Sequence, residues 1–282
     1  MNQALIVAAP GWAIVAAALL GLVIGSLLNV VIHRLPRMLE RQWQADAAAF
    51  GAPVEVAHEP YNLAIPRSHC PACGHRLRIS ELIPLVSWFA LRGRCSACAA
   101  PISLRYPLVE AGCAALFALC GWRFGLTGSG LACMLCCALL LGCAVIDLET
   151  QLLPDALTLS LLWAGLLVAL ALGPVALTDA VAGAAAGYAS LWLIHHGFRL
   201  ITHREGMGYG DFKLLAALGA WLGWQLLPAV VLIASAAGAI FTLSAAALGR
   251  RDARQPIAFG PWLAAAGVLA LFFGNAWPTL AG

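Results

Sequence analysis

The chain has 282 residues, of which 62% are hydrophobic and only 10% are charged. Soluble globular proteins carry about 25% charged residues, so this composition excludes an ordinary water-soluble protein. The net charge of +3 is small, and no apolar segment is interleaved with the dense basic stripe of a nucleic-acid-binding protein. We therefore expect a lipid bilayer, and not nucleic acid, as the partner of most of the chain.

Eight apolar stretches approach the ~20 residues that a helix needs to cross a bilayer. The first follows no Lys or Arg and is long enough to span, so we expect it to stay in the protein rather than act as a signal peptide. The sixth and seventh are separated by only a few residues around Gly223 and Pro228, so one fused span is the alternative. The eight stretches are residues 10–32, 107–124, 129–147, 156–173, 176–198, 212–225, 227–248 and 257–276.

The positions of the basic residues favour eight spans over seven. With the N-terminus outside, eight spans leave every basic residue except Arg123 inside or at the inner end of a span. A fused span would move Arg250, Arg251 and Arg254 outside, against the excess of Lys and Arg in cytoplasmic loops. The sequence thus predicts an all-α polytopic membrane protein with eight transmembrane helices, a periplasmic N-terminus and a cytoplasmic loop 33–106. The other inner segments are 148–155, 199–211 and 249–256.

The cytoplasmic loop begins with residues 37–66, which predict a short amphipathic helix and then an irregular connector. Two Cys-x-x-Cys pairs follow, with a spacing typical of structural zinc sites. Four thiolates complete a tetrahedral shell and leave no place for a catalytic water. The reducing cytoplasm disfavours disulfides, and free or redox-active thiols are the alternative. The sequence predicts structural Zn²⁺ bound by Cys70, Cys73, Cys95 and Cys98.

Two carboxylates stand out, because an acidic side chain at membrane depth is costly and its default interpretation is functional. Asp147 ends the third predicted span and Asp211 begins the sixth, both at the inner face, so we expect them to meet. In such a pair one carboxyl holds a proton while the other takes a proton from water, as in an aspartic protease. Gly208 and Gly210 offer bare backbone to an extended substrate. The alternatives make Asp211 a helix N-cap and Asp147 a solvated helix end. Lys213 is either a cation beside Asp211 or a side chain that extends to the membrane interface.

Other polar residues near the spans are interpreted as structural. Asp155 and Asp179 have the pattern of helix caps, and Glu110 is expected to pair with a nearby arginine. His195 and His196 are expected to anchor a helix end at the interface. The remaining cysteines are expected to act as small apolar side chains; they are Cys113, Cys120, Cys133, Cys136, Cys137 and Cys143.

Together these residues resemble the type IV prepilin peptidases, bifunctional leader peptidases and N-methyltransferases of bacterial inner membranes. The resemblance covers nearly the whole chain and includes both cysteine pairs. Residues 146–147 with 153–155 resemble the first catalytic segment of the family, and residues 208–213 resemble the second, its GxGD signature. Further shared segments are 25–36, 87–88, 91–95, 102–110 and 259–261.

This resemblance implies prepilins and pseudopilins of type IV pili and type II secretion as substrates. The family removes a short basic leader after a Gly on the cytoplasmic side, with Asp147 and Asp211 here as the catalytic pair. It then methylates the new N-terminus, often Phe, with S-adenosylmethionine. The implied domains are the first transmembrane helix (1–32), a zinc-binding and methyltransferase domain (33–106) and the transmembrane peptidase domain (107–282).

The contacts of S-adenosylmethionine rest on the resemblance alone, because the chain shows no Rossmann-type glycine fingerprint. Glu81, Gly93 and Arg94 are candidates for these contacts, and packing of the zinc domain is the alternative. A peptidase without methyltransferase activity is a second hypothesis for the whole chain. A proton-coupled transporter is a third, although its acids would lie near the midplane, and an assembly scaffold leaves the paired acids unexplained. The sequence carries no signal for an oligomeric state.

Overall fold

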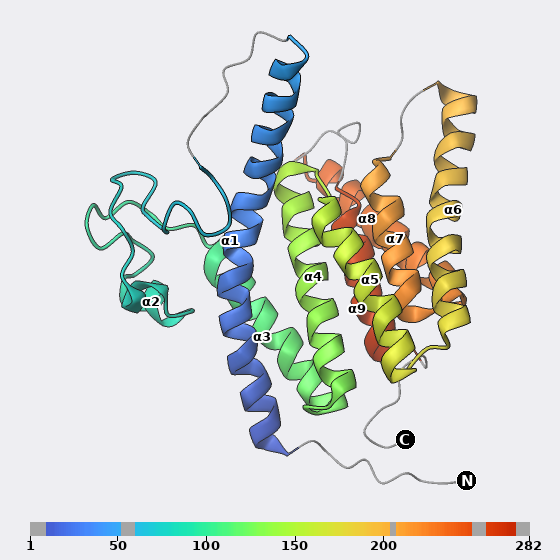
Figure 1. Cartoon of the computed structure of the whole chain (residues 1–282), viewed down its shortest axis with the longest axis horizontal. Helices are drawn as coiled ribbons and strands as arrows, with labels where there is room; N and C mark the ends of the chain where they lie inside the picture. Colours follow the sequence, from blue (N-terminus) through green and yellow to red (C-terminus); the bar gives the residue numbers. More distant parts are fainter. Residues whose placement is uncertain (1–9, 52–59, 204–206, 250–257, 275–282) are drawn as a thin grey trace. The chain divides into compact units, whose positions relative to one another are not determined.

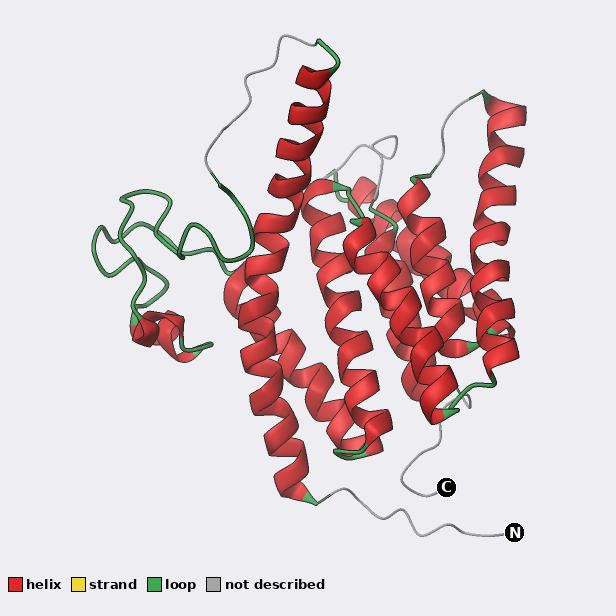
Figure 2. Cartoon of the chain, viewed as in Figure 1, coloured by secondary structure: helices red, strands yellow, loops and turns green. Residues whose placement is uncertain are grey.

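The structure, a computed structural model, describes residues 10–51, 60–203, 207–249 and 258–274. Throughout this part of the chain the regular elements are helices (Figure 2), which confirms the all-α prediction. The chain divides into two compact units, Ile14–Leu119 and Cys120–Gly282 together with Met1–Ala13. The two cysteine pairs belong to the first unit, and the two aspartates belong to the second.

Each predicted span, where it is described, overlaps a separate helix. These helices are α1 Gly11–Ala49, α3 Arg105–Phe124, α4 Gly128–Thr150, α5 Asp155–Leu172, α6 Leu177–Thr202, α7 Tyr209–Leu222, α8 Leu227–Ala247 and α9 Gly260–Phe273. Six are long and apolar enough to cross a membrane, with α8 counted together with the preceding 3-10 helix η2 (Trp224–Leu226). Since α7 and α9 have only 14 residues each, the structure shows a multi-pass helical protein with six candidate spans. Four of the basic residues that indicate the inner side lie outside the described residues; they are Arg204, Arg250, Arg251 and Arg254.

The first helix is longer than predicted, since α1 continues through Pro36 to Ala49. The prediction of a separate amphipathic helix after residue 37 is therefore wrong. Proline removes one helical hydrogen bond and crowds the preceding turn, but the residues that follow Pro36 are mostly Met, Leu, Glu, Arg, Gln and Ala, which are strong helix formers. The predicted connector is irregular where it is described, from residue 60 onward.

Within the first unit, α1 and α3 pack closely as an antiparallel pair. A Cβ atom on Gly25 would lie only 2.8 Å from the Cα atom of Glu110, so the two backbones approach as they do at small-residue contacts of membrane helices. Four residues further along α1, the amide of Asn29 donates to the carbonyl of Tyr106 at 3.0 Å. Gly25 therefore lies level with Glu110, and Asn29 lies level with Tyr106.

The second unit is built around α7, which packs against α5, α6 and α9 and lies between α5 and α6 in Figure 1. Eleven of its residues, from Asp211 to Leu222 apart from Lys213, are buried, as expected for a helix that is apolar on all sides. The indole of Trp221 donates to the Leu161 carbonyl at 2.8 Å and ties α7 to α5. Consequently the short α7, which carries Asp211, is held by the longer helices α5 and α6 and by α9.

The break between α7 and α8 excludes the fused helix of the seven-span alternative. α7 ends at Leu222, and Gly223 follows with a φ of +78°, a left-handed conformation that glycine adopts without the strain of a Cβ atom. A Cβ atom there would also lie 2.7 Å from the side-chain oxygen of Gln225. The sixth and seventh apolar stretches are thus two helices.

Candidate functional site

Asp147 lies in the last turn of α4, and its side chain is only 5% exposed. Its Oδ2 atom accepts a hydrogen bond of 2.9 Å from the backbone N–H of Gly260, the first residue of α9. The first N–H groups of a helix have no partner within the helix and favour a negative charge. Asp147 is therefore tied to the start of another helix, and the alternative of a solvated helix end is wrong.

Asp211 lies in the first turn of α7 and is 7% exposed. The N-cap of this helix is Gly208, so the alternative that Asp211 is the N-cap is wrong. Among the residues that the structure describes, its Oδ1 atom is buried without a hydrogen-bond partner. The charge of Asp147 acts on Asp211, so the structure brings the two carboxyl groups within electrostatic range.

Leu153, in the connection between α4 and α5, packs against the segment that carries Asp211 and against the start of α9, which bonds to Asp147. A Cβ atom on Gly210 would lie 2.6 Å from the Cβ atom of Leu153, and one on Gly260 would lie 3.3 Å from its Cδ1 atom. Close packing against Leu153 thus explains why residue 210 is a glycine, which the sequence alone did not explain. Gly208 is exposed, and a Cβ atom there would approach only Asp211, at 3.9 Å, so it is the more open of the two glycines.

Lys213 and Asp155 form an ion pair between α7 and α5, with 2.6 Å between Nζ and Oδ1. The N-cap of α5 is Pro154, and Asp155 is the first helical residue, so the prediction that Asp155 is the cap is wrong. Lys213 pairs with Asp155 and not with Asp211. Because both side chains are partly exposed, such a pair contributes at most about 1 kcal/mol to stability.

Two other predictions at helix ends are corrected. The N-cap of α6 is Ala176, and Asp179 in its first turn accepts a hydrogen bond from the Trp224 indole at 3.2 Å. His195 is only 3% exposed, which contradicts an interfacial anchor, and its ring packs against Tyr209 within the GxGD segment. Its two ring nitrogens have no hydrogen-bond partner in the described ranges.

Glu110 is also buried, and no arginine among the described residues pairs with it. Its Oε2 atom accepts a hydrogen bond of 2.8 Å from the backbone N–H of Leu85, and its side chain also bonds to Ser26 on α1. The expected arginine partner is wrong because a backbone donor from the polar loop reaches Glu110. The six cysteines outside the two pairs are all buried, as predicted for small apolar side chains.

The four loop cysteines come together, with all four Sγ atoms within 4.8 Å of one another. The Sγ atoms of Cys70 and Cys98 are 3.8 Å apart. Four thiolates arranged tetrahedrally at a Zn–S distance of about 2.3 Å have sulfurs ~3.8 Å apart. The cluster could therefore hold a metal ion, with Cys73 and Cys95 as the other two ligands.

The two cysteine pairs form equivalent turns. The N–H of Gly74 donates to the Cys70 carbonyl, and the N–H of Ala99 donates to the Cys95 carbonyl, both at 2.9 Å. Gly74 and Ala99 have φ values of +72° and +56°, so each turn closes through a left-handed residue. Backbone N–H groups of Cys73 and Ala72 lower the pKa of Cys70 to about 7, which favours the thiolate that binds metal.

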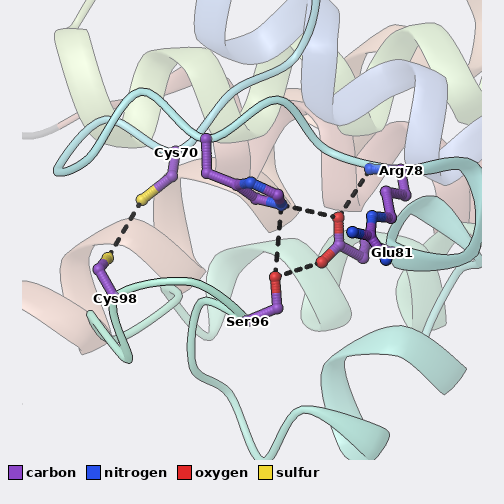
Figure 3. A network of polar contacts seen from close by, with 6 residues as sticks. Cys70, Arg78, Glu81, Ser96 and Cys98 are labelled. Atoms are coloured by element: carbon purple, nitrogen blue, oxygen red, sulfur yellow. Dashed lines mark hydrogen bonds and ion pairs between the residues drawn. The ribbon is translucent and has the colours of Figure 1, made fainter.

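A polar network links the two turns to the 3-10 helix η1 (Ile79–Leu82), as Figure 3 shows. The carboxylate of Glu81 accepts hydrogen bonds from the backbone N–H of Arg78 at 2.7 Å and from the hydroxyl of Ser96. It also contacts His75 at 3.3 Å. These donors, led by the Arg78 N–H, lower the pKa of Glu81 to about 2, so the carboxylate stays charged. It crosslinks the polar lobe, as we call residues 60–104.

The comparisons with known proteins agree with this geometry. Residues 19–124 match the bacterial peptidase A24 N-terminal domain, and residues 134–243 match the type IV leader peptidase family. A protein of Burkholderia pseudomallei named prepilin leader peptidase/N-methyltransferase is 53% identical over 94% of this chain and 87% of its own length. The chain belongs to the type IV leader peptidase family. Two further proteins with the same name are similar. The one from Stutzerimonas stutzeri is 49% identical over 93% of this chain and 91% of its own length, and the one from Aeromonas hydrophila is 52% identical over 91% of this chain and 89% of its own length. No solved structure matches.

In this leader peptidase the candidates for S-adenosylmethionine contacts have roles within the lobe. Glu81 is engaged by three donors. Gly93 has a φ of +66°, and a Cβ atom there would lie 2.8 Å from the ring of Trp88. Only Arg94 presents an exposed side chain. Hydrogen bonding and packing therefore account for two of the three, and their contact with S-adenosylmethionine stays a prediction.

Gly260 is a part of the leader peptidase site that sequence reasoning missed, and its only signal was the shared segment 259–261. Replacing it with Ala should lower the rate of prepilin cleavage by about 100-fold, because the new Cβ atom would lie 2.7 Å from the Asp147 Oδ2 atom and a displacement of ~1 Å has this effect. Single-turnover kinetics measure the rate. Gly197→Ala, where nothing lies within 4 Å, is the control; equal rates for both variants would contradict the prediction.

Proposed function

We propose that the chain cleaves the leader peptides of prepilins and pseudopilins beside the inner face of the membrane and then methylates the new N-terminus. The observation that carries the proposal is the burial of Asp147 and Asp211 within electrostatic range of each other in a leader peptidase family. Relatives about half identical over nearly the full chain are named for both activities. No observation on the described residues favours a transporter or a scaffold.

In the proposed peptidase reaction, one aspartate acts as a general base and takes a proton from a water molecule. The water oxygen attacks the carbonyl carbon of the leader Gly, and the other aspartate, protonated, donates to the leaving amine of the next residue as the C–N bond breaks. The Gly260 N–H keeps Asp147 in place, and the unpartnered Oδ1 atom of Asp211 can bond water or the scissile carbonyl. Because the pair titrates as a unit, the two roles are assigned to the pair.

The proposed topology retains all eight helices as spans in a bacterial inner membrane, with the N-terminus in the periplasm and residues 33–106 in the cytoplasm. A 14-residue helix is only ~21 Å long, less than the hydrocarbon core of ~30 Å. The burial of α7 among longer helices supports its place in the bundle despite this length. The proposed domains remain the first transmembrane helix (1–32), the zinc-binding and methyltransferase domain (33–106) and the peptidase domain (107–282).

The proposed cofactors are a structural Zn²⁺ held by the four loop cysteines and S-adenosylmethionine, which would supply the methyl group. The chain would provide the zinc-bound lobe at the face of the membrane where cleavage releases the new amine. Methylation in this proposal follows cleavage, because the acceptor nitrogen is part of a peptide bond until then.

The proposal is tested by incubating a purified prepilin with the wild-type protein in nanodiscs, with and without S-adenosylmethionine. Cleavage is expected in both reactions, and the mature product should gain one methyl group on its N-terminal residue only with the cofactor. Intact mass spectrometry measures both events. Cleaved but unmethylated product in both reactions would leave a peptidase alone, and uncleaved prepilin would remove the proposed function.

A further inference from the structure

The polar lobe contains an apolar segment that neither the peptidase site nor the zinc cluster uses. Residues 79–91 form η1 and the short helix α2 (Val86–Ala90), and Glu81 is their only charged residue. Five large apolar side chains in this segment are exposed; they are Ile79, Leu82, Ile83, Val86 and Phe89. Ile79 and Phe89 are 84% and 66% exposed. Such a concentration of apolar surface marks an interaction site.

The opposite side of the segment packs within the lobe. The Trp88 indole donates to the carbonyl of Ile102 at 3.4 Å and lies against the backbone of Gly93. The carboxylate of Glu81 is held by Arg78, Ser96 and His75. With its charge and its indole facing inward, the segment presents mainly apolar side chains outward.

The depth of the segment follows from one hydrogen bond within the first unit. Leu85, between η1 and α2, donates its backbone N–H to Glu110 of α3, and Glu110 lies level with Gly25 and bonds to Ser26 of α1. Ser26 precedes Arg34, the first basic residue of α1, by eight residues, which is ~12 Å along a helix. The segment is therefore anchored beside the apolar part of α1, ~12 Å along the helix axis from the first basic residue of that helix.

Exposed arginines flank the segment on both sides; they are Arg76 and Arg78 before it and Arg92 and Arg94 after it. Apolar side chains beside basic residues are the signature of a segment that lies in the membrane interface, and arginines near its ends bind anionic headgroups. The basic leader of a prepilin would be repelled by the same arginines. Charge and depth therefore both favour lipid over the substrate leader as the occupant.

We propose that residues 79–91 lie in the adjoining leaflet of the bilayer, with their exposed apolar side chains among acyl chains and the flanking arginines against anionic headgroups. The polar lobe then contacts the membrane directly through this segment, in addition to its covalent links to α1 and α3. This contact extends the proposed function and does not depend on either activity.

The test uses the wild-type full chain in nanodiscs of zwitterionic and anionic phospholipids that include a lipid with a photoactivatable diazirine in its acyl chain. After illumination, trypsin releases the segment as peptide 79–92, because Arg78 and Arg92 bound it. We expect lipid adducts on peptide 79–92 and on the α3 peptide 106–123, and none on peptide 68–76, which carries the first cysteine turn. Tandem mass spectrometry locates the adducts.

Adducts on peptide 106–123 without adducts on 79–92 would overturn the proposal, and so would equal labelling of 68–76. Phe89→Glu should reduce adducts on 79–92 several-fold while the zinc content stays unchanged. Adding a prepilin should leave the adducts in place; their loss, with crosslinks from the apolar helix of the prepilin to 79–92, would identify the substrate as the occupant instead. Because these readouts follow lipid contact and not turnover, they stand apart from a failure of the proposed function.

Discussion

Replacing Asp147 or Asp211 with Asn should lower prepilin cleavage at least about 1,000-fold, because general acid–base catalysis contributes ~10²–10⁴-fold and each variant removes a proton acceptor from the pair. Asn has nearly the same shape as Asp, so the buried sites are filled and the helices are expected to stay packed. The measurement is the rate at which purified variants in nanodiscs convert a prepilin to its mature form. Full processing by either variant would remove the aspartic-peptidase assignment.

Asp155→Asn is the matched control for both variants. Asp155 lies close in sequence to Asp147 and pairs with Lys213, two residues from Asp211, yet its side chain is 58% exposed. Its replacement should change the free energy of unfolding by less than about 1 kcal/mol and preserve most of the cleavage rate. A loss as large as that of Asp147→Asn would show that any charge change at this membrane edge stops the reaction.

The meeting of Asp147 and Asp211 could be predicted because charges are scarce in this chain and the basic residues assign an inner side. Their surroundings could not be predicted in the same way. Gly260 lies 113 residues from Asp147, and nothing in the local sequence says which backbone N–H will reach a given carboxylate. His195 was missed for a similar reason, since a histidine near a helix end has the same pattern whether it faces lipid headgroups or the interior.

In the polar lobe, too, some features could be predicted from the sequence and others could not. The Cys-x-x-Cys spacing encodes the turn geometry locally, so the convergence of four thiols followed from the sequence. The partner of Glu110 did not, because a backbone donor carries no sequence signature and Leu85 N–H fills the place expected for an arginine. The continuation of α1 through Pro36 was missed because the first span was bounded by its apolar residues, whereas the helix formers that follow Pro36 extend the helix beyond the apolar stretch.

Replacing Cys70 with Ser should release zinc and unfold the lobe. Structural Zn²⁺ binds with an apparent free energy of ~10–16 kcal/mol, which is comparable to the whole stability of a small domain. The lobe has few other buried residues, since Cys70, Gly93 and Cys95 are the only buried ones among residues 60–104. We expect the metal content of the purified variant to fall to background and trypsin to cut at the exposed Arg76, Arg78, Arg92 and Arg94 at least about tenfold faster, because local opening governs proteolysis.

Cys136→Ala is the control, since Cys136 is buried in α4 and lies in the other compact unit. This variant should retain the metal and the resistance to trypsin. A chelator added to the wild-type protein should reproduce the effect of Cys70→Ser, and Zn²⁺ added back should reverse it. If Cys70→Ser retains its zinc, the cluster is not the ligand set; if zinc is lost while trypsin resistance is unchanged, hydrogen bonds such as those of Glu81 hold the lobe without the metal.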